Sequence, residues 1–180
     1  MNVKTIALCA ILLAGVVSAN AQQTEDHQLT ANFLLPGLIY EKGISENSTL
    51  AAEATIGFAL IDCSGCDAQF GIYPIGRLQY RHYYNFDRRN DRGKRTAGNT
   101  GNYIAPTFAV QGGDAVIGNL DYASNLLAGA GVVYGLQRTA PRGLQFRFEV
   151  GPGYFFDEFD EGFSLFLALK LGWVVSKRKK

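Results

Sequence analysis

Apolar and polar residues alternate along most of the chain after Gln28. The segment from Phe163 to Val175 is the clearest: its odd positions are all large and apolar, whereas its even positions include Ser164, Lys170 and Gly172. A period of two predicts a β-strand that turns one face to an apolar environment. Clusters of Gly, Asn, Asp and Ser separate such segments, as turns between antiparallel strands require. The pattern therefore predicts an all-β, antiparallel chain.

Seven segments carry the strand pattern. An up-and-down barrel with both ends on one side needs an even number of strands, and eight is the smallest common size. We therefore predict eight strands. The missing strand would come from a division of residues 28–44 or from residues 113–124, where 115–120 are a poor strand candidate. The seven segments are 29–42 (interrupted near Pro36-Gly37), 50–60, 77–81, 102–111, 126–137, 144–154 and 163–175.

Alternation alone fits two kinds of barrel. In a soluble barrel the apolar face is inside, whereas in an outer-membrane barrel it meets lipid and the polar face fills the lumen. Here the polar faces are rich in Gly, small residues and single charges of both signs, and aromatic residues recur near strand ends as in an interfacial girdle. Most predicted strands also exceed the about 5 or 6 residues of an average strand, and about 9 to 11 tilted residues cross the hydrocarbon. These features favour an up-and-down transmembrane β-barrel.

The first residues predict export. A basic start at 1–4 precedes a nearly unbroken apolar run at 5–17, and 18–21 ends in the small-x-small pattern of a signal-peptidase site. The run is shorter than the about 20 residues of a spanning helix. We predict a cleaved signal peptide at 1–21 and one barrel domain at 22–180 in the bacterial outer membrane.

Composition narrows the partners. The chain has 180 residues with 17 Lys and Arg against 16 Asp and Glu. Lys4 is the only charge in 1–21, so removing that segment leaves 16 of each sign. A neutral chain argues against nucleic acid as a partner, because phosphate binding requires a basic face.

With polar faces turned inward, a set of charged and amide side chains falls in the lumen. The interior of a small barrel is just wide enough for side chains, and buried charges are tolerated only when partnered. We therefore expect a paired, hydrogen-bonded plug. The alternative is a narrow conductance path or small-ligand cavity that selects anions through Arg77, Arg81 and Arg147. The predicted lumen residues are Glu53, Arg77, Gln79, Arg81, Gln145, Arg147, Glu149 and Lys170, with Glu41 as a further candidate.

Cys63 and Cys66 form a C-x-x-C pair, which fits a redox site, half of a zinc site or a structural disulfide. The flanking residues predict strand, turn, strand, without the helix start that would activate a redox thiol. His27 and His82 lack ligand-like spacing to the pair, so a four-ligand zinc site is incomplete. In an oxidising envelope we expect a disulfide.

The segment 85–101 is basic. Such a run is ordinarily a solvated loop, but on the extracellular side it would be a candidate anion-binding loop for the phosphates of lipopolysaccharide, through charge-assisted contacts from arginine. Its basic residues are Arg88, Arg89, Arg92, Lys94 and Arg95.

No catalytic motif is found. The chain has no G-x-S-x-G, no H-E-x-x-H and no phosphate-binding glycine loop. His82 directly follows the predicted strand 77–81, and the pattern places no Ser or Asp beside it. We predict a non-enzyme without cofactor or metal. The alternatives are a secreted, soluble lipocalin-like carrier of an apolar ligand and an outer-membrane lipid-modifying enzyme.

Several short runs of the chain belong together: Arg81-His82-Tyr83-Tyr84-Asn85, Arg88-Arg89, Gly93-Lys94, Thr96, Asn99-Thr100-Gly101-Asn102-Tyr103, Tyr40-Glu41-Lys42, Tyr134-Gly135-Leu136-Gln137-Arg138 and Glu149-Val150-Gly151. They resemble the signature of small outer-membrane β-barrel proteins common in Bacteroidota, with the OmpA/OmpX-like transmembrane architecture. The resemblance implies a monomeric barrel that contacts membrane lipid and is inserted by the barrel assembly machinery, and it implies no reaction. Outer-membrane barrels often end in an aromatic residue, whereas this chain continues past Trp173 to Lys180.

Overall fold

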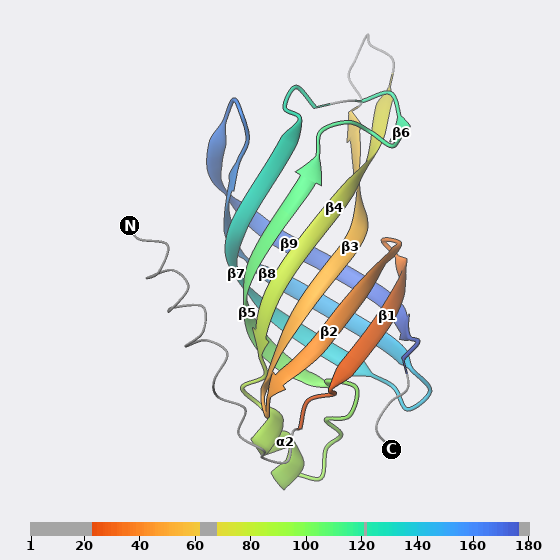
Figure 1. Cartoon of the computed structure of the whole chain (residues 1–180), viewed down its shortest axis with the longest axis vertical. Helices are drawn as coiled ribbons and strands as arrows, with labels where there is room; N and C mark the ends of the chain where they lie inside the picture. The colour runs from red at the N-terminus through yellow and green to blue at the C-terminus, as the bar shows by residue number, and fades with distance from the viewer. Residues whose placement is uncertain (1–22, 62–67, 121, 177–180) are drawn as a thin grey trace, which may run out of the picture.

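The computed structural model describes residues 23–61, 68–120 and 122–176 (Figure 1). The predicted signal peptide and the Cys63–Cys66 pair lie outside these residues. Within them the chain forms strands and one short helix, all strand pairings being antiparallel. The elements are β1 (His27–Leu34), β2 (Gly37–Ser45), β3 (Ser48–Ile61), β4 (Gln69–His82), α2 (Phe86–Asp91), β5 (Gly101–Gly112), β6 (Ile117–Gly118), β7 (Leu126–Thr139), β8 (Leu144–Phe156) and β9 (Glu161–Val174).

Eight of these strands close into a ring. Each ring strand pairs with its neighbours in chain order, and β1 pairs with β9 through Thr30–Val174, Ala31–Trp173 and Asn32–Gly172. This is an up-and-down barrel, which confirms the predicted all-β, antiparallel, eight-stranded fold (Figure 1). The two-residue β6 pairs with β4 only and stands outside the ring.

The eighth strand comes from the division of the first predicted segment. Leu35 has a φ of 55° and Pro36 follows it, so the chain reverses between β1 and β2. A left-handed φ is incompatible with extended backbone, so a single strand cannot continue through Leu35. The described residues of the other candidate segment, 113–124, contribute only β6.

Strand β4 is longer than the predicted 77–81. Its first half was missed because Tyr73 and Ile75 point into the barrel, where the pattern elsewhere places polar or small residues. Apolar residues on both faces, together with Pro74, remove the alternation that identifies a strand.

The two ends of the barrel differ (Figure 1). One end, here called the termini end, carries both described chain ends, the segment 83–100 with α2, and the turns 46–47 and 140–143. The opposite end, here called the loop end, carries the connections 113–125 and 157–160.

The β1–β2 hairpin is short and stops well below the loop end (Figure 1). β2 pairs with β3 only as far as Thr55, and β1 pairs with β9 only as far as Leu171. Toward the loop end, 56–61 of β3 pair with β4 alone and 161–170 of β9 pair with β8 alone. The wall is therefore complete near the termini end and lacks two strands near the loop end.

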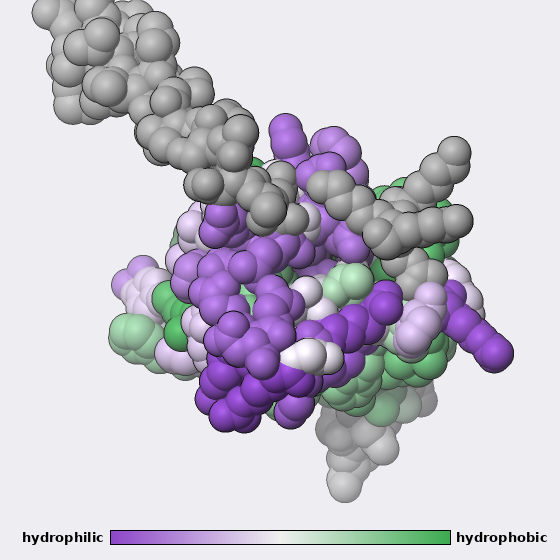
Figure 2. Space-filling model, turned by 90° about the horizontal axis from the view of Figure 1, so that it is seen from below, coloured by the Kyte–Doolittle hydropathy of each residue, from purple (hydrophilic) through white to green (hydrophobic). Residues whose placement is uncertain are grey.

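The outside of the barrel is apolar. On β9, Leu165 and Leu167 are 56% and 65% exposed, whereas Ala168 and Lys170 are 6% and 2% exposed. Seen from the termini end, hydrophilic residues cover much of the end face and hydrophobic residues gather on the flanks (Figure 2). No helix among the described residues has the length and apolar character to cross a bilayer.

Candidate functional site in the lumen

The predicted lumen residues lie at inward positions of β3, β4, β8 and β9. Period-two geometry places every second side chain on the same face, so the register of each strand fixes which side chains point inward. Arg77 is the most accessible of them, with 12% of its side chain exposed. The others are 6% exposed or less: Glu53, Gln79, Arg81, Gln145, Arg147, Glu149 and Lys170.

Glu149 lies at the centre of this network. Its carboxylate accepts hydrogen bonds from Arg77 Nη1 at 2.6 Å and from the Tyr103 hydroxyl at 2.5 Å. Arg81 Nη2 and Lys170 Nζ each lie 3.7 Å from a Glu149 oxygen. One buried carboxylate thus faces three cations, which compensate its charge in the lumen.

Glu41, the further candidate, forms a second centre nearer the termini end. Arg81 Nη1 lies 2.9 Å away, and the hydroxyls of Thr49 and Tyr83 each donate at 2.7 Å. Arg147 Nη2 lies 3.8 Å from the same carboxylate. Burial, reinforced by the Glu41 charge, raises the pKa of Tyr83 well above its ordinary value, so this phenol stays a neutral donor.

A third ion pair joins Lys170 Nζ to Glu53 at 2.5 Å. Because Lys170 also approaches Glu149, the three carboxylates and four cations at inward strand positions form one connected set. Buried ion pairs offset their desolvation only when their remaining donors and acceptors are satisfied.

Buried glutamine side chains accept some of the hydrogen bonds that the guanidinium groups donate. Gln79 Oε1 accepts from Arg81 Nε at 2.9 Å and from Arg81 Nη2 at 2.6 Å. The Arg147 guanidinium donates to Gln137 at 2.8 Å and to Gln145 at 3.0 Å. The network is therefore a plug made of charges and amides, in which the guanidinium groups of Arg81 and Arg147 each contact side chains of more than one strand.

The sequence interpretation missed Tyr83, Tyr103 and Gln137 as members of the plug. Tyr103 and Gln137 share the inward parity of β5 and β7, which was the available signal. Tyr83 follows β4, so no strand periodicity identifies it.

An aromatic cap closes the plug at the termini end. Phe86 at the start of α2 is fully buried and stacks on Tyr83, with ring centroids 4.6 Å apart. Tyr83 in turn packs against Tyr103 at 5.1 Å. Asn85 fixes the segment by accepting a hydrogen bond from the Asn102 backbone N–H at 2.9 Å.

The basic segment lies on this same end. Arg88 and Arg89 belong to α2, and Arg89 donates to the Arg95 carbonyl at 2.7 Å, so part of the run holds its own loop. Arg92 and Lys94 are exposed. If the chain termini lie in the periplasm, this segment faces the periplasm as well. The lipopolysaccharide hypothesis requires it on the opposite, extracellular side.

Similarity to known proteins does not assign this chain to a family. Comparison with protein families, curated proteins and solved structures finds no match for this chain.

His82 does have a serine beside it, contrary to the expectation from sequence. β3 and β4 place Ser48 opposite His82, with Oγ 3.1 Å from Nδ1, and the Tyr80 hydroxyl donates to the same Oγ at 3.0 Å. The pair lies on the outside of the barrel near the termini end. Among the described residues no hydrogen bond or ion pair joins His82 to a carboxylate, so the orienting acid of a Ser-His-Asp triad is missing there.

Within the described residues no three His, Cys, Asp or Glu side chains gather as a metal site. The proposed disulfide of Cys63 and Cys66 stays a prediction, because both residues lie outside the described part of the chain.

Proposed function

We propose that this chain is an outer-membrane β-barrel protein with a structural or binding role, exported by its signal peptide and closed by a polar plug. The observation that carries the proposal is the distribution of side chains, with apolar residues outside the ring and paired charges inside it. The resemblance to small Bacteroidota barrels agrees with this role, as do a monomeric state, contact with membrane lipid and insertion by the barrel assembly machinery.

The outer surface supports a lipid environment. Leu78 on β4, Ile104 on β5 and Leu169 on β9 are each close to half exposed or more, at 60%, 48% and 47%. Contiguous apolar patches above a few hundred Å² are rare on soluble monomers. In a bilayer an apolar outer surface is favourable, because it contacts lipid.

The inner surface argues against a lipocalin-like carrier. Such a carrier would enclose its ligand with apolar side chains, whereas Glu41, Arg81 and Glu149 occupy the interior here. The same residues support a lumen that does not conduct, because their side chains fill it at mid-height and Phe86 covers them at the termini end.

Envelope fractionation tests the proposal. The mature chain is expected in the outer-membrane fraction, with a mobility on gels that changes between unboiled and boiled samples. Purified protein in planar bilayers is expected to give no steady channel current. A soluble periplasmic or secreted band without a heat-dependent shift would overturn the proposal.

The Ser48–His82 contact gives the enzyme alternative its own test. A lipid-modifying activity that is present in the wild type and lost in His82→Ala would favour that alternative. The matched control is His27→Ala, because His27 is the other histidine of the chain and contacts Tyr40 rather than a serine.

A further inference from the structure

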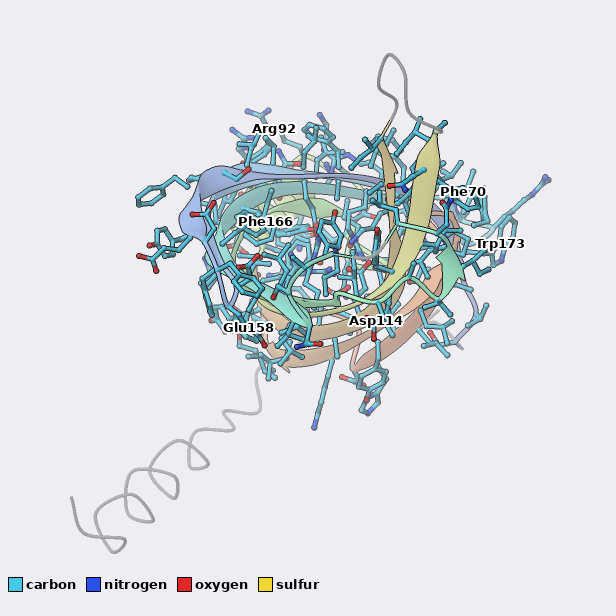
Figure 3. The ribbon with its side chains drawn as sticks, turned by 90° about the horizontal axis from the view of Figure 1, so that it is seen from above. Phe70, Arg92, Asp114, Glu158, Phe166 and Trp173 are labelled. Carbon is cyan, nitrogen blue, oxygen red and sulfur yellow. The ribbon has the colours of Figure 1, made fainter. Side chains whose placement is uncertain are left out.

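The lumen contains a cavity between the polar plug and the loop end. Its volume is about 190 Å³, and β4, β5, β7, β8 and β9 line it. Seen from the loop end, Phe166 lies inside the ring (Figure 3). An apolar cavity of about 150 Å³ holds one benzene molecule, so this volume accepts a ligand built on a single ring or a short acyl chain.

The cavity has one cationic group, one neutral amide and otherwise apolar lining residues. Phe155 and Phe166 pack against each other with ring centroids 4.6 Å apart, and Ile75, Ala109 and Leu127 complete the apolar wall. The Arg77 guanidinium lies 5.9 Å from the Phe166 ring centroid, at the junction of cavity and plug.

The charge of Arg77 is only partly compensated. Its one carboxylate partner is Glu149, which Arg81 and Lys170 also approach. The Nε of Arg77 is buried and has no hydrogen-bond partner within the described structure. Across the inward strand positions four cations face three carboxylates. An unpaired donor and a surplus positive charge both favour an anionic ligand.

Gln111 adds a neutral hydrogen-bonding group on another wall. It lines the cavity from β5, and its Oε1 would lie 3.3 Å from a Cβ at Gly57. Because Gly57 has no side chain, no Cβ crowds the amide of Gln111. A few convergent polar groups on an apolar wall are typical of small-molecule sites.

We propose that this cavity binds a small carboxylate with an aromatic or short acyl body. Its carboxylate pairs with Arg77, its second polar contact is the Gln111 amide, and its apolar body packs on Phe155 and Phe166. The inference rests on the binding role proposed above and specifies the class of ligand.

Titration with 4-fluorobenzoate, followed by ¹⁹F NMR, tests the site on the full mature chain folded in detergent micelles. Empty micelles correct for partition of the probe. Saturable binding is expected, and the neutral isostere 4-fluorobenzyl alcohol should bind at least about tenfold more weakly because it cannot pair with Arg77. Equal affinity for the acid and the alcohol would overturn the proposal.

Two pairs of variants locate the binding. Leu127→Trp fills the cavity from β7, where it faces Gln111 rather than an ion-paired residue, and should strongly weaken binding. Leu126→Trp, at an exposed position of the same strand that does not line the cavity, should leave binding unchanged. Arg77→Gln should weaken binding of the acid but not of the alcohol, with exposed Arg88→Gln as the charge-matched control. If Arg77→Gln does not fold, Gln111→Leu takes its place and should weaken binding of the acid. Unchanged binding in Leu127→Trp would overturn the site.

The binding test can be carried out whether the protein is a membrane barrel or soluble. Folding of each variant is judged by its heat-dependent gel shift, or by circular dichroism if the chain proves soluble. If the chain is soluble and binds the acid, the membrane proposal is wrong and the cavity proposal stands. If the chain is a membrane barrel and does not bind the acid, the cavity proposal is wrong and the membrane proposal stands.

Discussion

The ring of Tyr103 occupies the space beside Gly135 on the neighbouring strand. The two residues are opposite each other in the β5–β7 register, and a Cβ at position 135 would overlap the phenol ring. Tyr103 reaches Glu149 across this space, so a missing side chain on β7 positions the hydroxyl that supports the central carboxylate.

Gly135→Ala should therefore destabilise the barrel. Overpacking a filled interior costs about 1–3 kcal/mol, and displacement of Tyr103 would remove its hydrogen bond as well. Urea unfolding in phospholipid vesicles measures the change. The control is Gly162→Ala, where an added Cβ meets no atom within 4 Å and no change is expected. Equal stability of Gly135→Ala and the wild type would contradict this packing role.

Removing the charge of Glu149 should have a larger effect. Glu149→Gln leaves Arg77, Arg81 and Lys170 without their shared carboxylate, and loss of one partner from a buried ion pair costs about 3–5 kcal/mol. Glu161→Gln at the exposed start of β9 is the matched control and should change the free energy of unfolding by less than about 0.5 kcal/mol. Similar values for both variants would mean that the plug does not stabilise the barrel.

Arginine substitutions along β9 report what surrounds the barrel. Leu167→Arg should cost about 2–4 kcal/mol if its outward side chain meets the middle of the bilayer, and Phe163→Arg, near the strand end, about 0–1 kcal/mol. Ala168→Arg should be destabilising for another reason, because it crowds the lumen next to Glu149. A neutral Leu167→Arg would indicate water outside the barrel, since exposed substitutions in soluble proteins are usually within about 0.5 kcal/mol.

The two ends of the barrel should face opposite compartments. With Cys63 and Cys66 replaced by Ser, a cysteine at Asp160 on the loop end should react with an impermeant maleimide on intact cells. A cysteine at exposed Arg92 on the termini end should react only after the outer membrane is permeabilised. The opposite labelling would place the basic segment outside and restore the lipopolysaccharide hypothesis.

Strand parity was sufficient to place individual side chains in the lumen. On β8, the alternation of Gln145, Arg147 and Glu149 with Phe146 and Phe148 determines which face each side chain joins, whatever the partners are. The identity of the partners could not be predicted in the same way. Arg77 meets Glu149 over a separation of 72 residues, and only the order and register of the strands decide that contact.

Two features that the sequence did not predict also depend on the assembled barrel. Ser48 and His82 are neighbours because of the β3–β4 register, which cannot be read from the sequence. Tyr73 and Ile75 are apolar yet inward, because the lumen changes from polar to apolar along its length, and a rule that assigns one polarity to each face fails there.

The short contact between β1 and β9 has a consequence for the order of folding. β8 and β9 pair over thirteen positions close in sequence, whereas β1 and β9 join at four, with partners such as Thr30 and Val174 at opposite ends of the chain. Contacts between residues far apart in sequence carry the largest loop-closure entropy and form late. Ring closure is therefore the last and most reversible step of assembly, and the amides of β1 that face β9 should exchange with solvent before those of any other seam.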